Sequence, residues 1–400
     1  MNNNDKFLFL EIKQEKLIFF AGEYDDNLNF KIIEKITEKA EGFENGKVIN
    51  LDQAHKVIHK NLEKIEKITN YTFSKINIVT DQKNFDCINI SGFKKLKSSQ
   101  ILKEDIEYLI NISKRLIHEN NEDKSIIHLF NSKFNLDNSV LENLPIGLYG
   151  EFYNHQLTFF LLKEIDLKNL RLLFRKCNLT INRIILKSFI EGIGQIKNNS
   201  QIKKFCNIKI GKNQSHISIF DNSSYVFSEF FNFGTNMIIN DLSKVCSLKH
   251  ETVINFISNI IFDDLKISDK DFFLDQKYLK NENFRKISHS LLKDIIDARI
   301  TEIINLIYNK NVNLYFIKNE LQVVFIELDD KIIFNSLKDT IIKKIESYND
   351  TAAHRVVDNE EFKPLITAAE LISKGWSKEA IPVKQAKKSI ISRFFSTLFN

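Results

Sequence analysis

The sequence predicts an α/β protein with two sheet-bearing lobes. Two stretches, 6–80 and 205–242, each carry several strand patterns followed by a helix pattern. The length of 400 residues is sufficient for two or three domains that each bury a core. Strands that alternate with helices along a chain favour sheets whose faces are covered by helices.

The stretch 205–242 contains three expected strands and the start of a helix. Apolar patterns predict strands over 205–210, 216–220 and 225–233. A short turn, Gly211 to Gln214, joins the first two strands, and a helix begins near Asn236. A turn of this kind can cradle a phosphate when glycines let its backbone N–H groups approach the ligand.

The N-terminal stretch has a similar order. Residues 7–12 and 17–24 are expected to form a hairpin, and a turn-rich segment over 42–50 precedes a helix over 52–68. A strand is expected over 76–80. This strand–strand–strand–helix–strand order is typical of a half-lobe of the actin/Hsp70 architecture.

Glycine is scarce in this chain. Average usage of about 7% predicts roughly 28 glycines in a chain of this length, and the sequence has 11. Two explanations stay open together. Lys, Asn and Ile are abundant throughout, which indicates a compositional bias, and the loss of glycines also suits a chain whose phosphate-binding loops have degenerated.

Charge and cysteine usage exclude some classes of protein. A net charge of +5 without basic clusters interleaved with aromatics gives no sign of nucleic-acid binding, although a mild attraction to anionic membranes is compatible with it. The cysteines show no metal-binding spacing and are expected to be reduced thiols of a cytoplasmic protein: Cys87, Cys177, Cys206 and Cys246. His55 and His59 have no third ligand nearby, so they are expected on a solvated helix face.

Several motifs in the chain resemble one family. They are Gly42-x-x-x-Gly46-x-Val48-x-Asn50 before a helix, Leu144-Pro145-Ile146-Gly147-Leu148-Tyr149-Gly150, the helix–Cys–strand return over 168–184, and Thr235-Asn236 with Asp241-Leu242 at a helix start. Their order and spacing resemble those of the bacterial cell-division protein FtsA, a member of the actin/Hsp70-like superfamily.

The resemblance implies a domain organisation. Lobe I is expected from 1–80 and 165–200, and 81–164 is expected to be an inserted α+β subdomain of the FtsA type. Within it, a helix over 103–118 and strands over 125–130 and 156–162 are expected. The remaining parts are expected to be lobe II at 201–375, a linker at 376–385 and a C-terminal amphipathic helix at 386–400.

The three loops that hold nucleotide in actin-like ATPases have departed from their usual chemistry. Glu11 replaces an Asp, Lys209 and His216 stand where carboxylates are expected, and glycine is missing from the first turn. The degenerate loops and the helix start beside them comprise Glu11, Lys13, Lys16, Lys209, Gly211, Lys212, His216, Gly234, Asp241, Glu327 and Asp329. ATP and Mg²⁺ are therefore not expected as cofactors, and the chain is not expected to be an enzyme.

Two alternatives for these loops stay open. Lys16 can contact phosphate, but a lysine in a hairpin turn is more often only solvated. Glu327 and Asp329 carry negative charge that repels phosphate, although in a rearranged site they could instead hold Mg²⁺.

Arg299 and Glu302 lie three residues apart on a long amphipathic helix expected over 284–308. The resemblance implies that they bind the C-terminal tail of the tubulin homologue FtsZ, and oppositely charged groups on one helix face suit a peptide of mixed charge. The alternative is a plain surface ion pair.

The C-terminal segment predicts a membrane-surface helix. Its apolar residues recur with helical spacing on one face: Ile390, Ile391, Phe394, Phe395, Leu398 and Phe399. Basic residues occupy the other face: Lys387, Lys388 and Arg393. A helix that docks in a partner's groove is the competing interpretation.

The sequence thus favours a membrane-associated actin-like adaptor in cell division. The resemblance implies that it tethers FtsZ filaments to the cytoplasmic face of the inner membrane, self-associates into filaments and recruits later division proteins. A PilM-like pilus-assembly protein and an actin-fold ATPase or sugar kinase are the alternatives.

Overall fold

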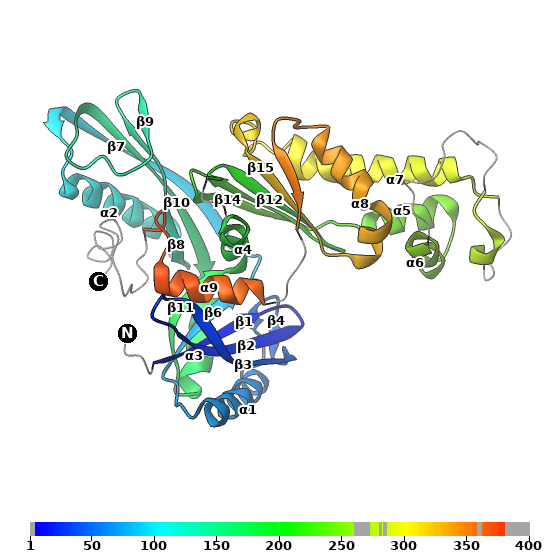
Figure 1. The fold of residues 1–400 in the computed structure, drawn as a ribbon, viewed down its shortest axis with the longest axis horizontal. Coiled ribbons are helices and arrows are strands. Elements are labelled where there is room, and N and C mark those ends of the chain that lie inside the picture. The colour runs from blue at the N-terminus through cyan, green and yellow to red at the C-terminus, as the bar shows by residue number, and fades with distance from the viewer. Residues whose placement is uncertain are drawn as a thin grey trace. The chain divides into compact units, whose positions relative to one another are not determined.

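A computed structural model describes residues 5–197, 199, 201–259, 273–279, 282, 286–357 and 362–380. The chain divides into two compact units (Figure 1). Unit 1 comprises Met1–Asn199, Asn222–Val226 and Glu360–Asn400, and unit 2 comprises Ser200–Asp221 and Phe227–Asn359.

Unit 1 contains a five-stranded sheet in the order β11-β6-β1-β2-β3. Its strands are β1 (Lys6–Ile12), β2 (Lys16–Tyr24), β3 (Phe30–Lys39), β6 (Lys75–Thr80) and β11 (Thr180–Leu186). The central strand β1 pairs antiparallel with β2 and parallel with β6. The predicted hairpin and the strand over 76–80 are confirmed. A small ribbon, β4 (Phe43–Glu44) and β5 (Lys47–Val48), precedes the first helix.

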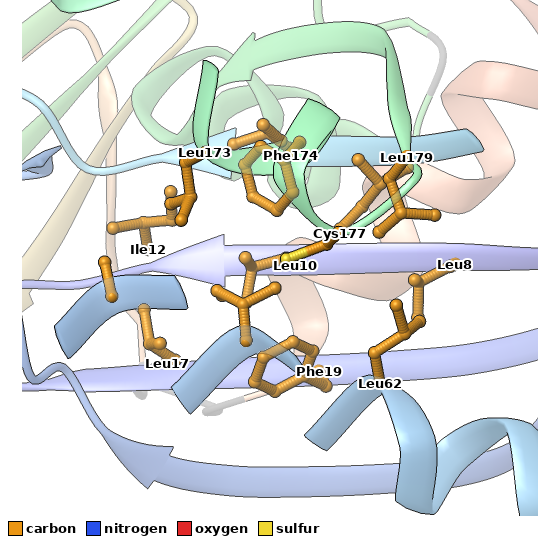
Figure 2. Packing of buried hydrophobic residues seen from close by; sticks show 14 of the residues in the cluster. Leu8, Leu10, Ile12, Leu17, Phe19, Leu62, Leu173, Phe174, Cys177 and Leu179 are labelled. Atoms are coloured by element: carbon orange, nitrogen blue, oxygen red, sulfur yellow. The ribbon is translucent and has the colours of Figure 1, made fainter. Parts of the chain in front are cut away.

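Helix α1 (Leu51–Thr69) begins and ends at asparagines. The Asn50 side chain accepts a hydrogen bond from the Gln53 backbone N–H at 3.0 Å, and Asn70 ends the helix in the left-handed conformation. Its apolar stripe packs with helix α3 (Glu164–Lys176) against one face of the sheet. Figure 2 shows residues of this core. Leu8, Leu10 and Ile12 are every second residue of β1, so they lie on the same face of the sheet.

The segment 86–163 forms a second sheet within unit 1, in the order β7-β10-β8-β9. Its elements are β7 (Asp86–Gln100), α2 (Lys103–Asn120), β8 (Lys124–Leu136), β9 (Ser139–Leu141) and β10 (Tyr149–Lys163). Helix α2 matches the predicted 103–118, and β8 and β10 extend beyond the predicted strands. Strand β7 was not predicted, because most of its side chains are polar or exposed and give no clear apolar alternation.

Unit 1 is completed by helices α4 (Lys187–Ile196) and α9 (Lys363–Lys374), which pack against each other. Helix α9 also contacts β1 and β3. Lobe II was expected to extend to residue 375, but unit 2 ends at Asn359, because the apolar face of α9 is buried against unit 1.

Unit 2 contains a five-stranded sheet in the order β14-β13-β12-β15-β16. Its strands are β12 (Phe205–Ile210), β13 (Ser215–Asp221), β14 (Ser224–Phe231), β15 (Val323–Leu328) and β16 (Ala353–Val356). Strand β12 pairs antiparallel with β13 and parallel with β15, as β1 does with β2 and β6. The two five-stranded sheets therefore share one topology, which accounts for the repeated order of elements in the sequence.

The helices of unit 2 are α5 (Asn236–Cys246), α6 (His250–Asn259), α7 (His289–Ile304) and α8 (Lys331–Glu346). Shorter helical turns occur at Gln276–Leu279 (η2), at the π-helical Asn305–Asn309 (η3) and at Lys318–Glu320 (η4). Helix α7 and the π-helical turn account for most of the helix predicted over 284–308. Within the described residues, no helix is both long enough and apolar enough to span a bilayer.

Candidate functional site

The first predicted nucleotide loop is a closed hairpin turn. The Lys13 N–H donates to the Lys16 carbonyl at 3.0 Å, and Lys16 begins β2. The Glu11 carboxylate is fully buried and lies 3.1 Å from Lys187 Nζ, with Lys13 Nζ at 3.5 Å. Burial raises the pKa of Glu11, and the two lysines oppose that shift. The charge of this acid is therefore balanced by lysines of its own unit.

The second predicted loop is packed onto the start of α5. The Gly211 N–H donates to the Gln214 carbonyl at 3.0 Å, and the Thr235 N–H donates to the Gly211 carbonyl at 3.0 Å. The Asn236 N–H donates to the Lys212 carbonyl at 2.9 Å. These backbone donors bond to carbonyls of the turn, so they do not form the open array of N–H groups that holds a phosphate.

Gly234 is required by this packing. A Cβ at this position would lie 2.0 Å from the Gly211 carbonyl oxygen and 2.7 Å from that of Lys212. Glycine therefore serves close contact between two backbone segments of unit 2. Gly234 was predicted to belong to the nucleotide loops, and in the structure it has a packing role.

Lys209, at the end of the strand before the second predicted loop, forms ion pairs with acids of the third. Lys209 and Glu327 are register partners on β12 and β15, and Lys209 Nζ lies 2.7 Å from Glu327 Oε1 and 3.3 Å from Asp329 Oδ2. The buried Asp330 accepts a hydrogen bond from the Thr235 hydroxyl at 2.9 Å. The acids after β15 are thus engaged within unit 2.

His216 is a buried structural residue of β13. Its Nε2 lies 2.7 Å from the Ser228 hydroxyl, and its ring stacks on Phe230 with 4.1 Å between centroids. The imidazole therefore packs in unit 2 and makes a hydrogen bond between neighbouring strands.

Several carboxylates and amides of the three loops are engaged within their own units. Glu11, Glu327 and Asp329 pair with lysines, and the turn amides bond to backbone carbonyls. Across the described ranges, no three His, Cys, Asp or Glu side chains are grouped so that they could hold a metal ion. Mg²⁺ needs several oxygen ligands that are free to coordinate it.

Arg299 and Glu302 meet on α7, and α5 supplies a third member. Arg299 Nη1 donates to Glu302 Oε2 at 2.6 Å, and Arg299 Nε donates to the Asp241 carboxylate. The hydrogen bond that Arg299 donates to Asp241 is the main reason that the pKa of Arg299 is raised. We call these three residues the charged trio. The sequence assigned Asp241 to the nucleotide loops, since nothing in its spacing indicates a contact with a helix far along the chain.

The predicted linker contains a docked segment. Glu379 and Ala380 are buried, and the Ala380 N–H donates to the Leu129 carbonyl of β8 at 2.7 Å. The His128 N–H at Nδ1 donates to Glu379 Oε1 at 2.6 Å, since its Nε2 accepts from the Leu186 N–H, and Arg183 also contacts that oxygen. The amphipathic helix predicted over 386–400 lies outside the described residues.

No family model matches this chain. Among solved structures, it superposes on one chain of a PilM–PilN type IV pilus biogenesis complex with a TM-score of 0.52 and 9% identity, over 91% of this chain and 96% of that chain. The likeness concerns the fold alone. With the duplicated sheet topology, it defines an α/β protein of the actin-like ATPase fold.

Sequence relatives narrow this class. Cell division protein FtsA of Buchnera aphidicola (Acyrthosiphon pisum) is 23% identical over 311 residues, which are 76% of this chain and 72% of that protein. FtsA of Escherichia coli K12 is 17% identical over 308 residues, 74% of this chain and 70% of the relative. The resemblance to FtsA is confirmed: the chain is similar in sequence to this cell-division protein and has the actin-like fold.

Proposed function

We propose that this protein is a membrane-associated adaptor of cell division that attaches FtsZ filaments to the cytoplasmic face of the membrane. The similarity to FtsA over three-quarters of the chain is the observation that carries this proposal. Recruitment of later division proteins and self-association belong to the same proposal. The motifs of the sequence and the actin-like fold support it together.

The charged trio is the proposed docking point for the C-terminal tail of FtsZ. Asp241 and Glu302 hold the Arg299 guanidinium in place, and the Glu302 side chain is 53% exposed. The exposed Val245 follows Asp241 by one helical turn and adds an apolar contact beside the charges. A peptide with both charged and apolar residues suits such a surface.

Weak or absent nucleotide binding is part of the proposal. The lysine partners of Glu11, Glu327 and Asp329, together with the closed second loop, support it. An adaptor whose contacts do not depend on ATP needs no exchange of nucleotide to stay attached. A tight titration of ATP that requires Mg²⁺ would contradict this part.

The amphipathic segment is the proposed membrane anchor. Each basic residue near anionic lipid contributes about 1 kcal/mol, and the apolar face adds partial burial in the interface. One segment is expected to bind weakly and reversibly. Several segments on one oligomer bind more tightly through effective concentration, so self-association and membrane attachment are coupled.

Co-flotation with anionic vesicles tests this function. Full-length protein is expected to float without ATP and to carry a peptide with the FtsZ C-terminal sequence. The double variant Phe394→Asp, Phe395→Asp is expected to stay at the bottom of the gradient. The variant Arg299→Glu is expected to float without the peptide, because reversed charge places three acids together and removes the trio's only cation.

A matched control is Lys293→Glu, a charge reversal on the same helix outside the trio. It is expected to float and to retain the peptide. Protein that floats but never carries the peptide would favour the PilM-like alternative, which the shared fold also suits. Flotation only after ATP addition would favour a nucleotide-controlled switch.

A further inference from the structure

We propose that unit 1 has an arginine-lined site for a small phosphate ester, separate from the nucleotide loops and the charged trio. The site is a cavity of about 400 Å³ between β8, α3 and β11, which are labelled in Figure 1. This volume lies within the range of pockets that bind small molecules. Arg171, Arg175 and Arg183 line it together.

Arg183 supplies the strongest observation. Its side chain is only 9% exposed, and its Nε and Nη1 atoms are buried without a hydrogen-bond partner. Only its Nη2 contacts Glu379. A buried guanidinium with unsatisfied donors is unfavourable, so the charge of an anion in the neighbouring cavity would stabilise Arg183.

The backbone of β11 positions this arginine. The pairing of β11 with β6 shifts register between Ile181 and Arg183, and β11 is the edge strand of its sheet. An irregularity of this kind redirects a side chain at a sheet edge. The bulge therefore places Arg183 in the wall of the cavity.

Helix α3 supplies the other two cations. Arg171 and Arg175 lie one turn apart on the same face, where like charges repel. Arg171 donates to Glu164 at 2.8 Å, whereas no carboxylate within the described parts of the chain pairs with Arg175. Three guanidinium groups thus face two carboxylates, and an anion restores the balance of charge.

The apolar residues that line the cavity indicate which class of anion it binds. Ile126, Leu167 and Ile184 give the cavity an apolar surface beside the arginines. A guanidinium fork binds the oxygens of a phosphate in a bidentate manner. A phosphate monoester with a small apolar group can contact both the arginines and the apolar wall. Inorganic phosphate can contact only the arginines.

Calorimetric titration of the full chain with phenyl phosphate and with inorganic phosphate tests the site. Phenyl phosphate is expected to bind at least about tenfold more tightly than inorganic phosphate, since it also uses the apolar wall. Arg175→Ala is expected to weaken phenyl phosphate about tenfold or more, and Arg175→Lys by less, because the charge remains but the fork is lost. Both substitutions are at an exposed position, so the fold is retained.

Two controls separate this site from others. Lys168→Ala removes an exposed cation from the same helix outside the cavity, and Lys212→Ala removes one from the second nucleotide loop. Neither is expected to change the affinity. No saturable binding at millimolar phenyl phosphate, or a loss caused by Lys212→Ala instead of Arg175→Ala, would overturn the proposal.

A lipid headgroup is the other source of a phosphate ester. Flotation of the Arg175→Ala protein on phosphatidylglycerol vesicles distinguishes the two. Unchanged flotation with weakened phenyl phosphate binding supports a free ligand. The opposite outcome has two parts: the unsubstituted protein does not bind phenyl phosphate, and the Arg175→Ala protein floats less than the unsubstituted protein. That result assigns the arginines to the lipid surface and overturns the proposal.

Discussion

Single residues of this chain show how buried charge is tolerated. Glu11, Lys187, Arg183 and Glu379 are all largely or wholly buried, and each has an oppositely charged partner far along the sequence. Removing one partner of a buried pair leaves the other uncompensated, which costs more than the pair itself contributes. The partners of these residues come from different elements, so local spacing in the sequence does not reveal them.

Lys187→Met is expected to lower the free energy of unfolding by about 3–5 kcal/mol at neutral pH. The substitution leaves the buried Glu11 carboxylate with Lys13, which is more distant. Burial already raises the pKa of Glu11, and loss of Lys187 raises it further. A carboxyl with a raised folded-state pKa contributes stability below its unfolded pKa and loses it as pH rises through the folded value. Urea unfolding is therefore expected to show a larger deficit at pH 8 than at pH 5.

Glu11→Gln serves as the control for this substitution, since it removes the charge that needs compensation and leaves Lys187 within 3.7 Å of Glu191. Its deficit is expected to be smaller and less dependent on pH. A Lys187→Met deficit that is the same at both pH values would show that lost packing, and not charge, is responsible.

At the scale of elements, the second loop depends on close backbone contact. Gly234→Ala is expected to destabilise the protein by about 1–3 kcal/mol, because its Cβ meets the Gly211 carbonyl and forces the turn away from α5. Gly194→Ala is a suitable comparison, because its Cβ meets side-chain atoms and no backbone, the nearest being the Thr367 hydroxyl at 3.1 Å. Thermal unfolding of both variants measures the difference. Equal midpoints would contradict the proposed role of Gly234.

Some elements could be predicted from the sequence and others could not. The hairpin of β1 and β2 and the helix α1 have strong apolar periodicity, so their residues alone define them. The ion pair of Arg299 with Glu302 follows from helical spacing, whereas the contact with Asp241 depends on the packing of α5 against α7. Strand β7 pairs along its length with β10 and gives only Ile88, Ile90 and Leu96 to the core of its sheet, so its sequence resembles a loop.

At the scale of the whole chain, two units with the same sheet topology each have their own core. This duplication is visible in the sequence as a repeated order of strands and helices. The docking of residues 376–380 within unit 1 is not visible there. Residues 376–380 have a linker-like composition, yet the buried contacts of Glu379 with His128 and Arg183 fix them to β8 and β11.

Two truncations test whether this docked segment belongs to the folded unit. A chain that ends at Ala380 keeps Glu379 and is expected to unfold at the same urea concentration as the full chain. A chain that ends at Ser377 loses Glu379 and leaves Arg183 buried without a carboxylate, which is expected to cost about 3–5 kcal/mol. Both keep Trp376, the one tryptophan of the sequence, so intrinsic fluorescence follows unfolding in each. Neither is expected to float with vesicles, since both lack the amphipathic segment. Equal stability of the two truncations would mean that the segment is only a tether, and that the boundary of the folded unit lies before Lys378.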